Sequence, residues 1–304
     1  MSEQHNAARV PFFLVDVFAD QPLEGNPLAI VADADEIGVE MMRSIAREFN
    51  QSETTFLLQP TQKGANWRLR SFTPSGAEVF GAGHNALGAW WWLAASGRLG
   101  AVPQRTYHQQ IGDQILAVEV SFQREGAIRI AMDHQLPEFG RAYSDLEALA
   151  AALGVRRDDL ADGPPPQVVS TGAPHLLVPI RTADGLDRLR LDASRLLPIL
   201  SQVRAQGCYC FFVGPPCSCA VARTRFFNPT VGIWEDPATG SAAVPLACCL
   251  RKDGVIREDG EYAIEQGHAM GRPSRITVLV SRHRVAVIGT AALSAEGQLF
   301  LGAS

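Results

Sequence analysis

The sequence has no excess of basic residues. Its 304 residues include 27 lysines and arginines and 32 aspartates and glutamates, and its formal net charge is -5. A protein that binds nucleic acids generally presents a strongly basic face to them. The charge balance therefore argues against a nucleic-acid partner.

The sequence also lacks a long apolar run near its start. The first ten residues, MSEQHNAARV, contain no basic segment that leads into an apolar stretch. Neither a signal peptide nor a membrane-spanning helix is predicted, and we expect a cytoplasmic protein with no membrane partner.

Cysteine is missing from the first half of the chain. All six cysteines lie in the second half, and without a signal peptide we expect them to be reduced thiols. Two Cys-x-Cys pairs, Cys208 with Cys210 and Cys217 with Cys219, could supply four thiolates to zinc. Structural zinc sites more often have two intervening residues, and free cysteine is a common buried residue. No metal is therefore predicted.

Motifs for nucleotide cofactors are missing as well. The sequence contains no G-x-x-x-x-G-K-[ST] loop, and no G-x-G-x-x-G that follows a strand in a βαβ unit. Four histidines without metal-like spacing are interpreted as structural or surface residues: His108, His134, His175 and His268. No cofactor is predicted.

The sequence does contain two copies of one pattern. The motif R-x-R-x-F-x-P begins at Arg68 and recurs about 155 residues later at Arg223. A second motif, Gly25-Asn-Pro27, recurs about 147 residues later as Gly172-Ala-Pro174. The offsets are close, and corresponding copies precede the same type of element, which favours an internal duplication.

A chain of 304 residues with 46% hydrophobic residues is long enough for two domains. The predicted lobes are residues 1–128, with a C-terminal strand at about 290–304, and residues 129–289. A cleft between the lobes is the expected place for a small ligand and for the active site.

Short segments rich in β-branched and aromatic residues, bounded by glycine, proline and polar residues, are predicted to be strands. They are 12–18, 28–33, 54–59, 67–72, 115–122, 127–132, 167–171, 175–180, 208–214, 219–227 and 275–289. Fewer segments are predicted to be helices: 38–49, 84–96, 145–153, 192–205 and 240–251.

Two of these helices, 84–96 and 240–251, are apolar on nearly every face. A helix that is apolar all round must be buried, and both are too short to cross a bilayer. We therefore expect each to lie inside a rolled sheet, one in each lobe.

The starts of these two helices are candidate anion sites. The first backbone N–H groups of a helix have no acceptor within the helix and carry the positive end of its dipole. The sequences there, Gly81-Ala-Gly83-His84-Asn85 and Asp236-Pro-Ala-Thr239-Gly240-Ser241, would let a carboxylate approach the backbone closely. The alternative is that side chains simply cap the helices, the candidates being Asn85, Thr239 and Ser241.

Glu53 is the candidate base. It lies where a predicted helix gives way to a strand, among hydroxyl residues and next to an apolar run. Partial desolvation would raise its pKa toward that of a useful general base. The alternative is an exposed or capping glutamate.

Six segments together carry a family resemblance. They are VDVFADQPLEGNPLAIV (15–31), QSETTF (51–56), RSFTPSGAEVFGAGHNALGA (70–89), STGAPHLLV (170–178), EDPATGSA (235–242) and EQGHAMGRPSRI (265–276). In them the chain resembles the PhzF-like family of phenazine biosynthesis, which shares the fold of diaminopimelate epimerase. The resemblance implies an α+β fold of two pseudo-symmetric lobes, each a β-barrel wrapped around a central apolar helix. It also implies a homodimer.

The resemblance further implies that Glu53 is the acid/base residue and that His84 and Asp236 lie beside it as catalytic residues. It implies that Gly83, Gly240 and Ser241 help to hold the carboxylate of a small carboxylic-acid substrate, and that Asn26 lies on a turn that borders the cleft. Asn85, where the chain departs from the family pattern, is also predicted to contact the substrate. The predicted reaction is a cofactor-independent isomerisation, because one group that takes up and returns a proton, with stabilisation of the developing anion, is sufficient for it.

Two other functions remain open. An epimerase or racemase of this fold would use a thiol at the start of each central helix, but the first start has Ala82, and Cys248 and Cys249 fall well inside the second helix. The other alternative is a protein that binds a small carboxylic acid on the same scaffold without turning it over.

Overall fold

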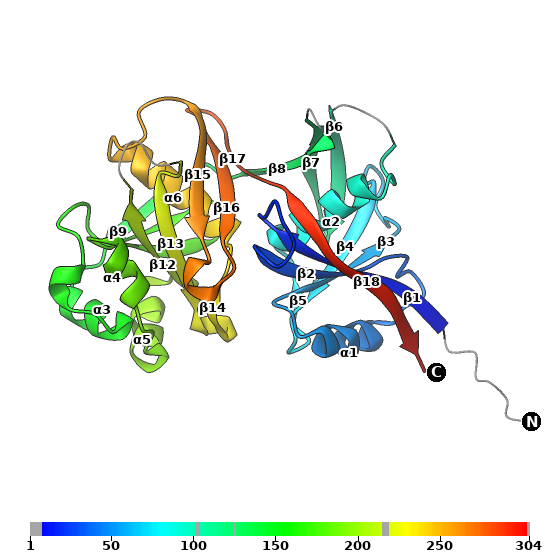
Figure 1. Ribbon diagram of the computed structural model, residues 1–304, viewed down its shortest axis with the longest axis horizontal. Coiled ribbons are helices and arrows are strands. Elements are labelled where there is room, and N and C mark those ends of the chain that lie inside the picture. Colours follow the sequence, from blue (N-terminus) through cyan, green and yellow to red (C-terminus); the bar gives the residue numbers. More distant parts are fainter. Residues whose placement is uncertain (1–7, 101–103, 124–125, 215–218, 303–304) are drawn as a thin grey trace, which may run out of the picture. The chain divides into compact units, whose positions relative to one another are not determined.

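The computed structural model describes residues 8–100, 104–123, 126–214 and 219–302. The fold is mixed, with extensive β-sheet and few helices (Figure 1). The chain divides into two compact units: the first is Met1–Ala131 with Thr290–Ser304, and the second is Met132–Gly289.

The first unit is built from two helices and nine strands among its described residues. In chain order they are β1 (Ala8–Val17), β2 (Asn26–Val31), α1 (Val39–Phe49), β3 (Thr54–Leu58), β4 (Trp67–Phe72), β5 (Glu78–Val79), α2 (His84–Ala95), β6 (Gln104–Ile111), β7 (Gln114–Phe122), β8 (Ile128–His134) and β18 (Ala291–Leu301). Strand β8 begins in this unit, where it pairs with β7, and carries the chain into the second.

The second unit contains the remaining elements. They are β9 (Glu138–Ala142), α3 (Leu146–Leu153), β10 (Gln167–Ser170), β11 (Pro174–Pro179), α4 (Ala183–Arg188), α5 (Ala193–Val203), β12 (Gly207–Val213), β13 (Ala222–Asn228), β14 (Ile233–Asp236), α6 (Gly240–Lys252), β15 (Gly260–Gln266), β16 (Ser274–Val280) and β17 (Val285–Gly289). Short 3-10 turns lie at Arg157–Asp159, Pro229–Val231 and His268–Met270.

One predicted strand is wrong. Residues 275–289 form two antiparallel strands, β16 and β17, instead of one. Ser281 and Arg284 close the turn between them, because the Ser281 hydroxyl accepts a hydrogen bond from the Arg284 backbone N–H at 2.9 Å. The polar run Ser281-Arg-His-Arg284 interrupts the apolar alternation, which is the signal of a turn.

The strand pairings have the same pattern in both units. In the first, β2 pairs with β3 in parallel, β3 with β4 antiparallel, β4 with β6 in parallel and β6 with β7 antiparallel. In the second, the pairs β11–β12, β12–β13, β13–β15 and β15–β16 repeat that sequence of directions. The same order of strand directions in both units is what an internal duplication would produce.

The repeated R-x-R-x-F motif has one structural purpose in both units. Its second arginine forms an ion pair with a glutamate on the short strand before the buried helix: Arg70 with Glu78 at 2.7 Å, and Arg225 with Glu235 at 2.8 Å. Each guanidinium also lies over the ring of the phenylalanine two residues later. Both pairs are largely buried, so the motif fixes the turn that leads into α2 and into α6.

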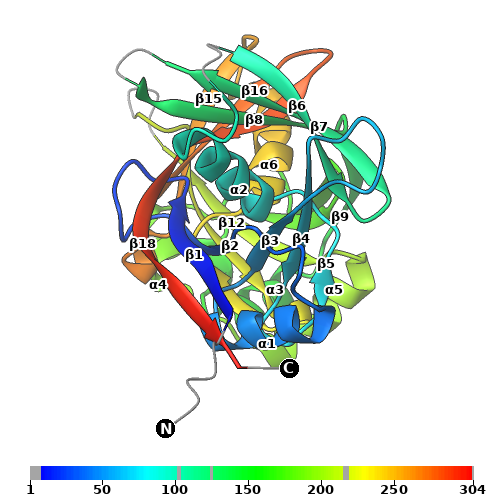
Figure 2. The same cartoon turned by 90° about the vertical axis from the view of Figure 1, so that its right-hand side faces the viewer.

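The two apolar helices are buried, as predicted. Helix α2 contacts β1, β2, β3, β7 and β18, and Figure 2 shows it among the strands of the first unit. A side chain at Gly88 would come within 2.7 Å of Leu28 and Val17, so glycine allows this close packing. Helix α6 contacts β10, β11, β16 and β17 of the second unit. Of the helices in the described residues, none is both long and apolar enough to span a membrane.

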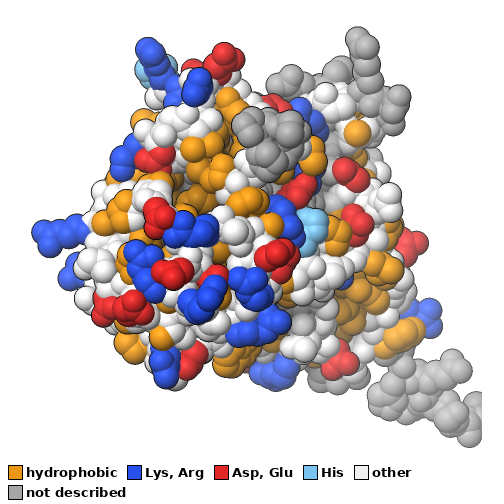
Figure 3. All heavy atoms as spheres, turned by 60° about the vertical axis from the view of Figure 1, so that its left-hand side comes forward, with side chains coloured by type: hydrophobic (Ala, Val, Ile, Leu, Met, Phe, Trp, Pro, Cys, Tyr) orange, Lys and Arg blue, Asp and Glu red, His pale blue; other side chains and the backbone are white. Residues whose placement is uncertain are grey.

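The surface carries no large field of one sign in the view of Figure 3, where basic and acidic side chains alternate. Three ion pairs of the second unit illustrate the pattern: Arg181–Asp162 at 2.6 Å, Arg188–Asp159 at 3.0 Å and Arg223–Asp187 at 3.3 Å. Exposed pairs of this kind contribute little to stability.

Candidate active site

Glu53 lies between helix α1 and strand β3, half-buried. Helix α1 ends at Phe49, and Asn50 turns the chain with a left-handed φ of 50°. Asparagine tolerates this conformation better than most residues. The turn ends the helix, and β3 begins four residues after Asn50, with Glu53 directly before the strand.

The residue before Glu53 connects two of the predicted site residues. The Ser52 hydroxyl lies 3.3 Å from Nε2 of His84 and donates to Oδ1 of Asn26 at 3.5 Å. Asn26 is the buried first residue of β2, and His84 is the first residue of α2. Burial lowers the pKa of His84 to about 4, so the ring is neutral near pH 7. Three segments distant in sequence thus meet at one point of the first unit.

Asn85 organises the start of α2. Its Oδ1 accepts a hydrogen bond from the Gly83 N–H at 2.7 Å, while its amide group donates to the Gly81 carbonyl and to the Ser71 hydroxyl, each at 3.0 Å. The Ser71 hydroxyl in turn lies 2.9 Å from that of Thr55 on β3. Asn85 is buried, and it ties the glycine loop to the sheet.

The capping alternative is wrong for Thr239. Thr239 is the N-cap residue of α6, but it makes no side-chain capping hydrogen bond. Its hydroxyl donates instead to the Asp236 carboxylate. Ser241 also has a different partner, since its hydroxyl lies 3.3 Å from Nε2 of His175. At Gly83, the N-cap of α2, there is no side chain to cap with.

In the second unit, Asp236 belongs to a buried polar network that includes Gln266. Asp236 is 8% exposed. Gln266 donates to the Asp236 carbonyl at 2.7 Å and to the Thr239 hydroxyl at 3.1 Å, and it accepts from the Thr239 N–H at 3.2 Å. Such networks hold their members in one geometry when every group is satisfied.

Sequence reasoning missed Gln266 and its partner Tyr209. The Tyr209 hydroxyl donates to Oε1 of Gln266 at 3.0 Å, and both side chains are fully buried. Burial raises the pKa of Tyr209, so its hydroxyl stays protonated and available as a donor. The available signal was the segment EQGHAMGRPSRI, which carries Gln266 but does not reveal its contacts.

His175 was interpreted as a structural or surface residue, and the structure places it beside a site residue. It is 2% exposed and lies on β11. Its neighbour Ser241 is the second residue of α6 and follows Gly240, which is buried. Burial lowers the pKa of His175 to about 4, so this ring is neutral near pH 7 as well.

Four of the five cysteines in the described residues have the environment of inert buried thiols. The Sγ atoms of Cys208 and Cys210 lie 3.8 Å apart inside the second unit, and burial raises the pKa of Cys210 well above its usual value. Cys219 is exposed, and Cys217 lies outside the described residues. Across the described parts of the chain, no group of three or more histidine, cysteine, aspartate or glutamate residues is arranged to hold a metal ion.

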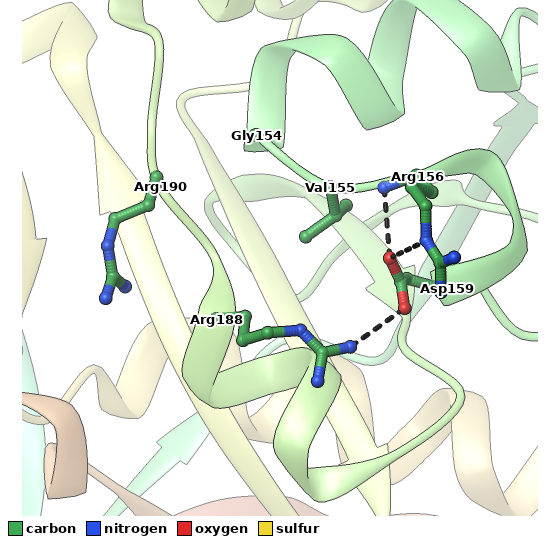
Figure 4. A pocket seen from close by; sticks show the side chains of 6 residues that line it. All are labelled: Gly154, Val155, Arg156, Asp159, Arg188 and Arg190. Carbon is green, nitrogen blue, oxygen red and sulfur yellow. Dashed lines mark hydrogen bonds and ion pairs between the residues drawn. The ribbon is translucent and has the colours of Figure 1, made fainter.

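A pocket of about 470 Å³ lies elsewhere in the second unit (Figure 4). Its lining residues are Gly154, Val155, Arg156, Asp159, Arg188 and Arg190. Asp159 pairs with Arg156 at 3.5 Å and with Arg188 at 3.0 Å, whereas the Arg190 side chain points away from this group. None of the predicted site residues lines this pocket.

Residues 15–297 match the family described as phenazine biosynthesis-like protein, PhzC-PhzF. The chain belongs to the PhzF family. The family resemblance seen in the sequence is therefore confirmed.

Two relatives from Pseudomonas species are named isomerases. The chain is 35% identical over 268 residues to the trans-2,3-dihydro-3-hydroxyanthranilate isomerase of Pseudomonas fluorescens, an alignment that covers 86% of this chain and 87% of that protein. It is 32% identical over 301 residues to the Pseudomonas aeruginosa protein of the same name, covering 95% and 99%. The chain is accordingly an isomerase of the PhzF family.

Solved structures of other proteins resemble this chain in fold. A PhzF-family protein from Bacillus anthracis superposes with a TM-score of 0.88 at 25% identity, over 97% of this chain and all of that one. A hydroxyproline epimerase from Agrobacterium vitis is similar at a TM-score of 0.60 and 12% identity, over 100% of this chain and 95% of that one, which shows a shared fold alone.

Proposed function

We propose that this PhzF-family isomerase moves a proton on a small carboxylic acid with Glu53 as the acid/base residue, and that it does so without a cofactor. The observation that carries the proposal is the contact of three distant segments in the first unit, at Asn26, Ser52 and His84. Glu53 adjoins Ser52, and Ser52 contacts both Asn26 and His84 at the start of α2. A carboxylate next in sequence to a serine that contacts a neutral imidazole at a helix start would supply the parts that a proton transfer requires.

The chemistry assigns different tasks to these groups. Glu53 would take a proton from one carbon of the substrate and return it to another, while charge developing on the substrate is stabilised by the positive end of the α2 dipole. His84 is neutral near pH 7, so it can donate one hydrogen bond and accept another without adding a charge.

Asn85 changes what the first helix start offers to a carboxylate. Because its Oδ1 already accepts the Gly83 N–H, a substrate carboxylate would have to bind the N–H groups of His84 and Asn85 or displace this contact. Gly83 then serves mainly by leaving space for the ligand, since it carries no side chain.

The proposal extends to the second unit. Asp236, Gly240 and Ser241 are proposed to act on the same substrate, with Asp236 as the third catalytic residue. Their support is the buried network of Asp236, Thr239 and Gln266, which holds the start of α6 in one geometry. An aspartate variant that keeps the network tests this part of the proposal: Asp236→Asn is expected to lower turnover while leaving the fold intact.

A thiol-based racemase is disfavoured. The sequence offers Ala82 where the first thiol would be, and Cys248 and Cys249 lie inside α6. Burial raises the pKa of Cys248 to about 11 and that of Cys249 to about 12, so neither is a thiolate near neutral pH.

The proposed substrate class is a cyclic, unsaturated amino or hydroxy carboxylic acid. Its support is the reaction after which the Pseudomonas relatives are named, the isomerisation of trans-2,3-dihydro-3-hydroxyanthranilate. We further propose that each unit is a barrel wrapped around its central helix, and that the protein works as a homodimer in the cytoplasm. Sedimentation analysis of the purified protein tests the dimer.

Glu53→Gln tests the function directly. The substitution keeps size and hydrogen bonding but removes the titrating carboxyl group, so turnover of trans-2,3-dihydro-3-hydroxyanthranilate is expected to fall about 10²- to 10⁴-fold, the usual contribution of acid/base catalysis. Calorimetric binding of the same compound should change little. Glu48→Gln makes the same chemical change on the exposed face of α1 and is the matched control.

The binding-protein alternative makes a different prediction. If the wild type binds the acid but never turns it over, and Glu53→Gln binds it equally well, the protein is a carboxylate-binding member of the family. If the wild type, Glu53→Gln and Glu48→Gln all turn the acid over at the same rate, a residue other than Glu53 is the base.

A further inference from the structure

His175 is a buried titratable residue that the proposed reaction does not use. It lies on β11 opposite Gly207 of β12, and its ring packs edge-on against Phe226, with ring centres 5.1 Å apart and planes at 90°. A side chain at Gly207 would come within 2.5 Å of the Phe226 ring, so the glycine makes room for this packing. The orientation of the imidazole is therefore fixed by its neighbours.

The two ring nitrogens of His175 have different surroundings. Nε2 lies 3.3 Å from the Ser241 hydroxyl, whereas Nδ1 is buried and has no hydrogen-bond partner among the described residues. A neutral imidazole carries one N–H group, which can sit on either nitrogen. A buried N–H without an acceptor is rarer in proteins than a buried acceptor without a donor. The proton therefore belongs on Nε2.

This tautomer decides what the serine can do. If Nε2–H donates to Oγ of Ser241, the hydroxyl oxygen is already an acceptor and its own proton is directed elsewhere. Ser241 is half-buried at the start of α6, where the positive end of the helix dipole favours an anion. The hydroxyl proton is then available to a negatively charged oxygen at this helix start.

We infer that His175 is a positioning residue that holds the Ser241 hydroxyl as a hydrogen-bond donor to a carboxylate bound at the start of α6. The inference rests on the proposed function, because it assumes that a carboxylic-acid substrate occupies this helix start. It deepens that function by assigning a role to a histidine outside the acid/base machinery. The first unit contains a serine–histidine contact with the two residue types exchanged: His84 begins the helix and Ser52 lies on the loop, whereas in the second unit the serine is on the helix.

The first experiment observes the tautomer. Two-bond ¹H–¹⁵N correlation spectra of protein labelled with ¹⁵N-histidine, with His175→Gln used for assignment, report which nitrogen carries the proton. We expect the Nε2–H form across pH 6–8 both in the free enzyme and with 3-hydroxyanthranilate, used as an unreactive carboxylate probe. A proton on Nδ1, or a doubly protonated ring at neutral pH, would overturn the inference.

The second experiment measures coupling between the two residues. The Kd for 3-hydroxyanthranilate is determined for the wild type, Ser241→Ala, His175→Leu, His175→Gln and the double variant Ser241→Ala/His175→Leu. We expect Ser241→Ala to raise the Kd about tenfold, the usual effect of losing a donor to a charged oxygen. His175→Leu should raise it severalfold in the wild-type background and by less than twofold once Ser241 is alanine. His175→Gln, which can still offer an N–H near the Nε2 position, should bind close to wild type.

The outcomes separate this inference from the proposed function. If the two substitutions raise the Kd independently, or if His175→Leu lowers only the melting temperature, His175 has a structural role and the inference fails while Glu53 catalysis stands. If Glu53→Gln turns over normally but the tautomer and the coupling are as expected, the proposed base is wrong and the carboxylate contact stands.

Discussion

His175 lies in a place where a positive charge is costly. Burial lowers its pKa to about 4, against about 6.5 in an unfolded chain. The unfolded protein therefore takes up a proton on this ring as the pH falls below about 6.5, while the folded protein does not do so until about pH 4. The ring destabilises the fold progressively over this window, by about 2–3 kcal/mol at pH 4.5.

Urea unfolding at pH 7 and pH 4.5 checks this prediction. His175→Gln should lose less stability than the wild type between the two pH values, because glutamine cannot take up a proton. Ser241→Ala is the control, since it keeps the buried ring and should keep the pH dependence. Equal losses in wild type and His175→Gln would show that the ring does not titrate as described.

Residues of the site differed in how far the sequence could predict them. Glu53, His84 and Asp236 lie in short motifs at element boundaries, and local sequence indicates such positions. Gln266 and His175 could not be assigned in this way, because their partners, Thr239 and Ser241, are separated from them by 27 and 66 residues. Only the folded chain brings these pairs together.

At the scale of elements, the arginine of each repeated motif fixes the turn into a buried helix. Arg225 and its partner Glu235 are more buried than Arg70 and Glu78, and Arg225 also donates to the carbonyls of Leu186 and Leu189 at 3.0 Å each. Breaking a buried pair leaves a charge without its partner, at a cost of about 3–5 kcal/mol.

Methionine substitutions of the arginines test how much these buried ion pairs stabilise the fold. Arg225→Met should lower the free energy of unfolding by about 3–5 kcal/mol, and Arg70→Met by less, because its pair is more exposed. Arg98→Met breaks the more exposed pair with Asp33 and should cost about 1 kcal/mol or less. The free energies of unfolding are measured by urea unfolding. A similar loss for all three variants would mean that the two repeated ion pairs stabilise the fold no more than an exposed pair does.

Elements were predictable to the extent that their patterns were local and apolar. Helices α2 and α6 were predicted within one residue at each end, since an all-apolar run is unambiguous. Strands such as β6 and β15 were missed because their sequences, QRTYHQQI and GEYAIEQ, are polar and resemble loops. Their pairing with β7 and β16 comes from the sheet, which local propensity does not encode.

At the scale of the whole molecule, the chain completes its first unit last. Strand β18 pairs with β1 along its whole length, from Ala8 opposite Leu301 to Val17 opposite Ala291. The first unit therefore cannot finish folding until β18 has been made, whereas the second unit is formed by one continuous stretch, Met132–Gly289.

A chain that ends at Gly289 tests this dependence. Without β18, amide hydrogens of β1 and β2 are expected to lose protection against hydrogen exchange, because β1 loses one of its two partner strands. The second unit, including β12 and β13, should keep its protection. Exchange followed by mass spectrometry distinguishes this result from uniform loss of protection, which would mean that the two units fold only together.

The central claim is that Glu53 carries the transferred proton, and solvent exchange tests it most directly. Wild type, Glu53→Gln and Glu48→Gln are incubated in deuterium oxide with trans-2,3-dihydro-3-hydroxyanthranilate and related unsaturated and amino carboxylic acids, and NMR follows deuterium incorporation and the position of the double bond. We predict that wild type and Glu48→Gln place deuterium at one carbon of one compound and shift its double bond, while Glu53→Gln does so at least about 100-fold more slowly. Exchange by Glu53→Gln at the wild-type rate would contradict the account.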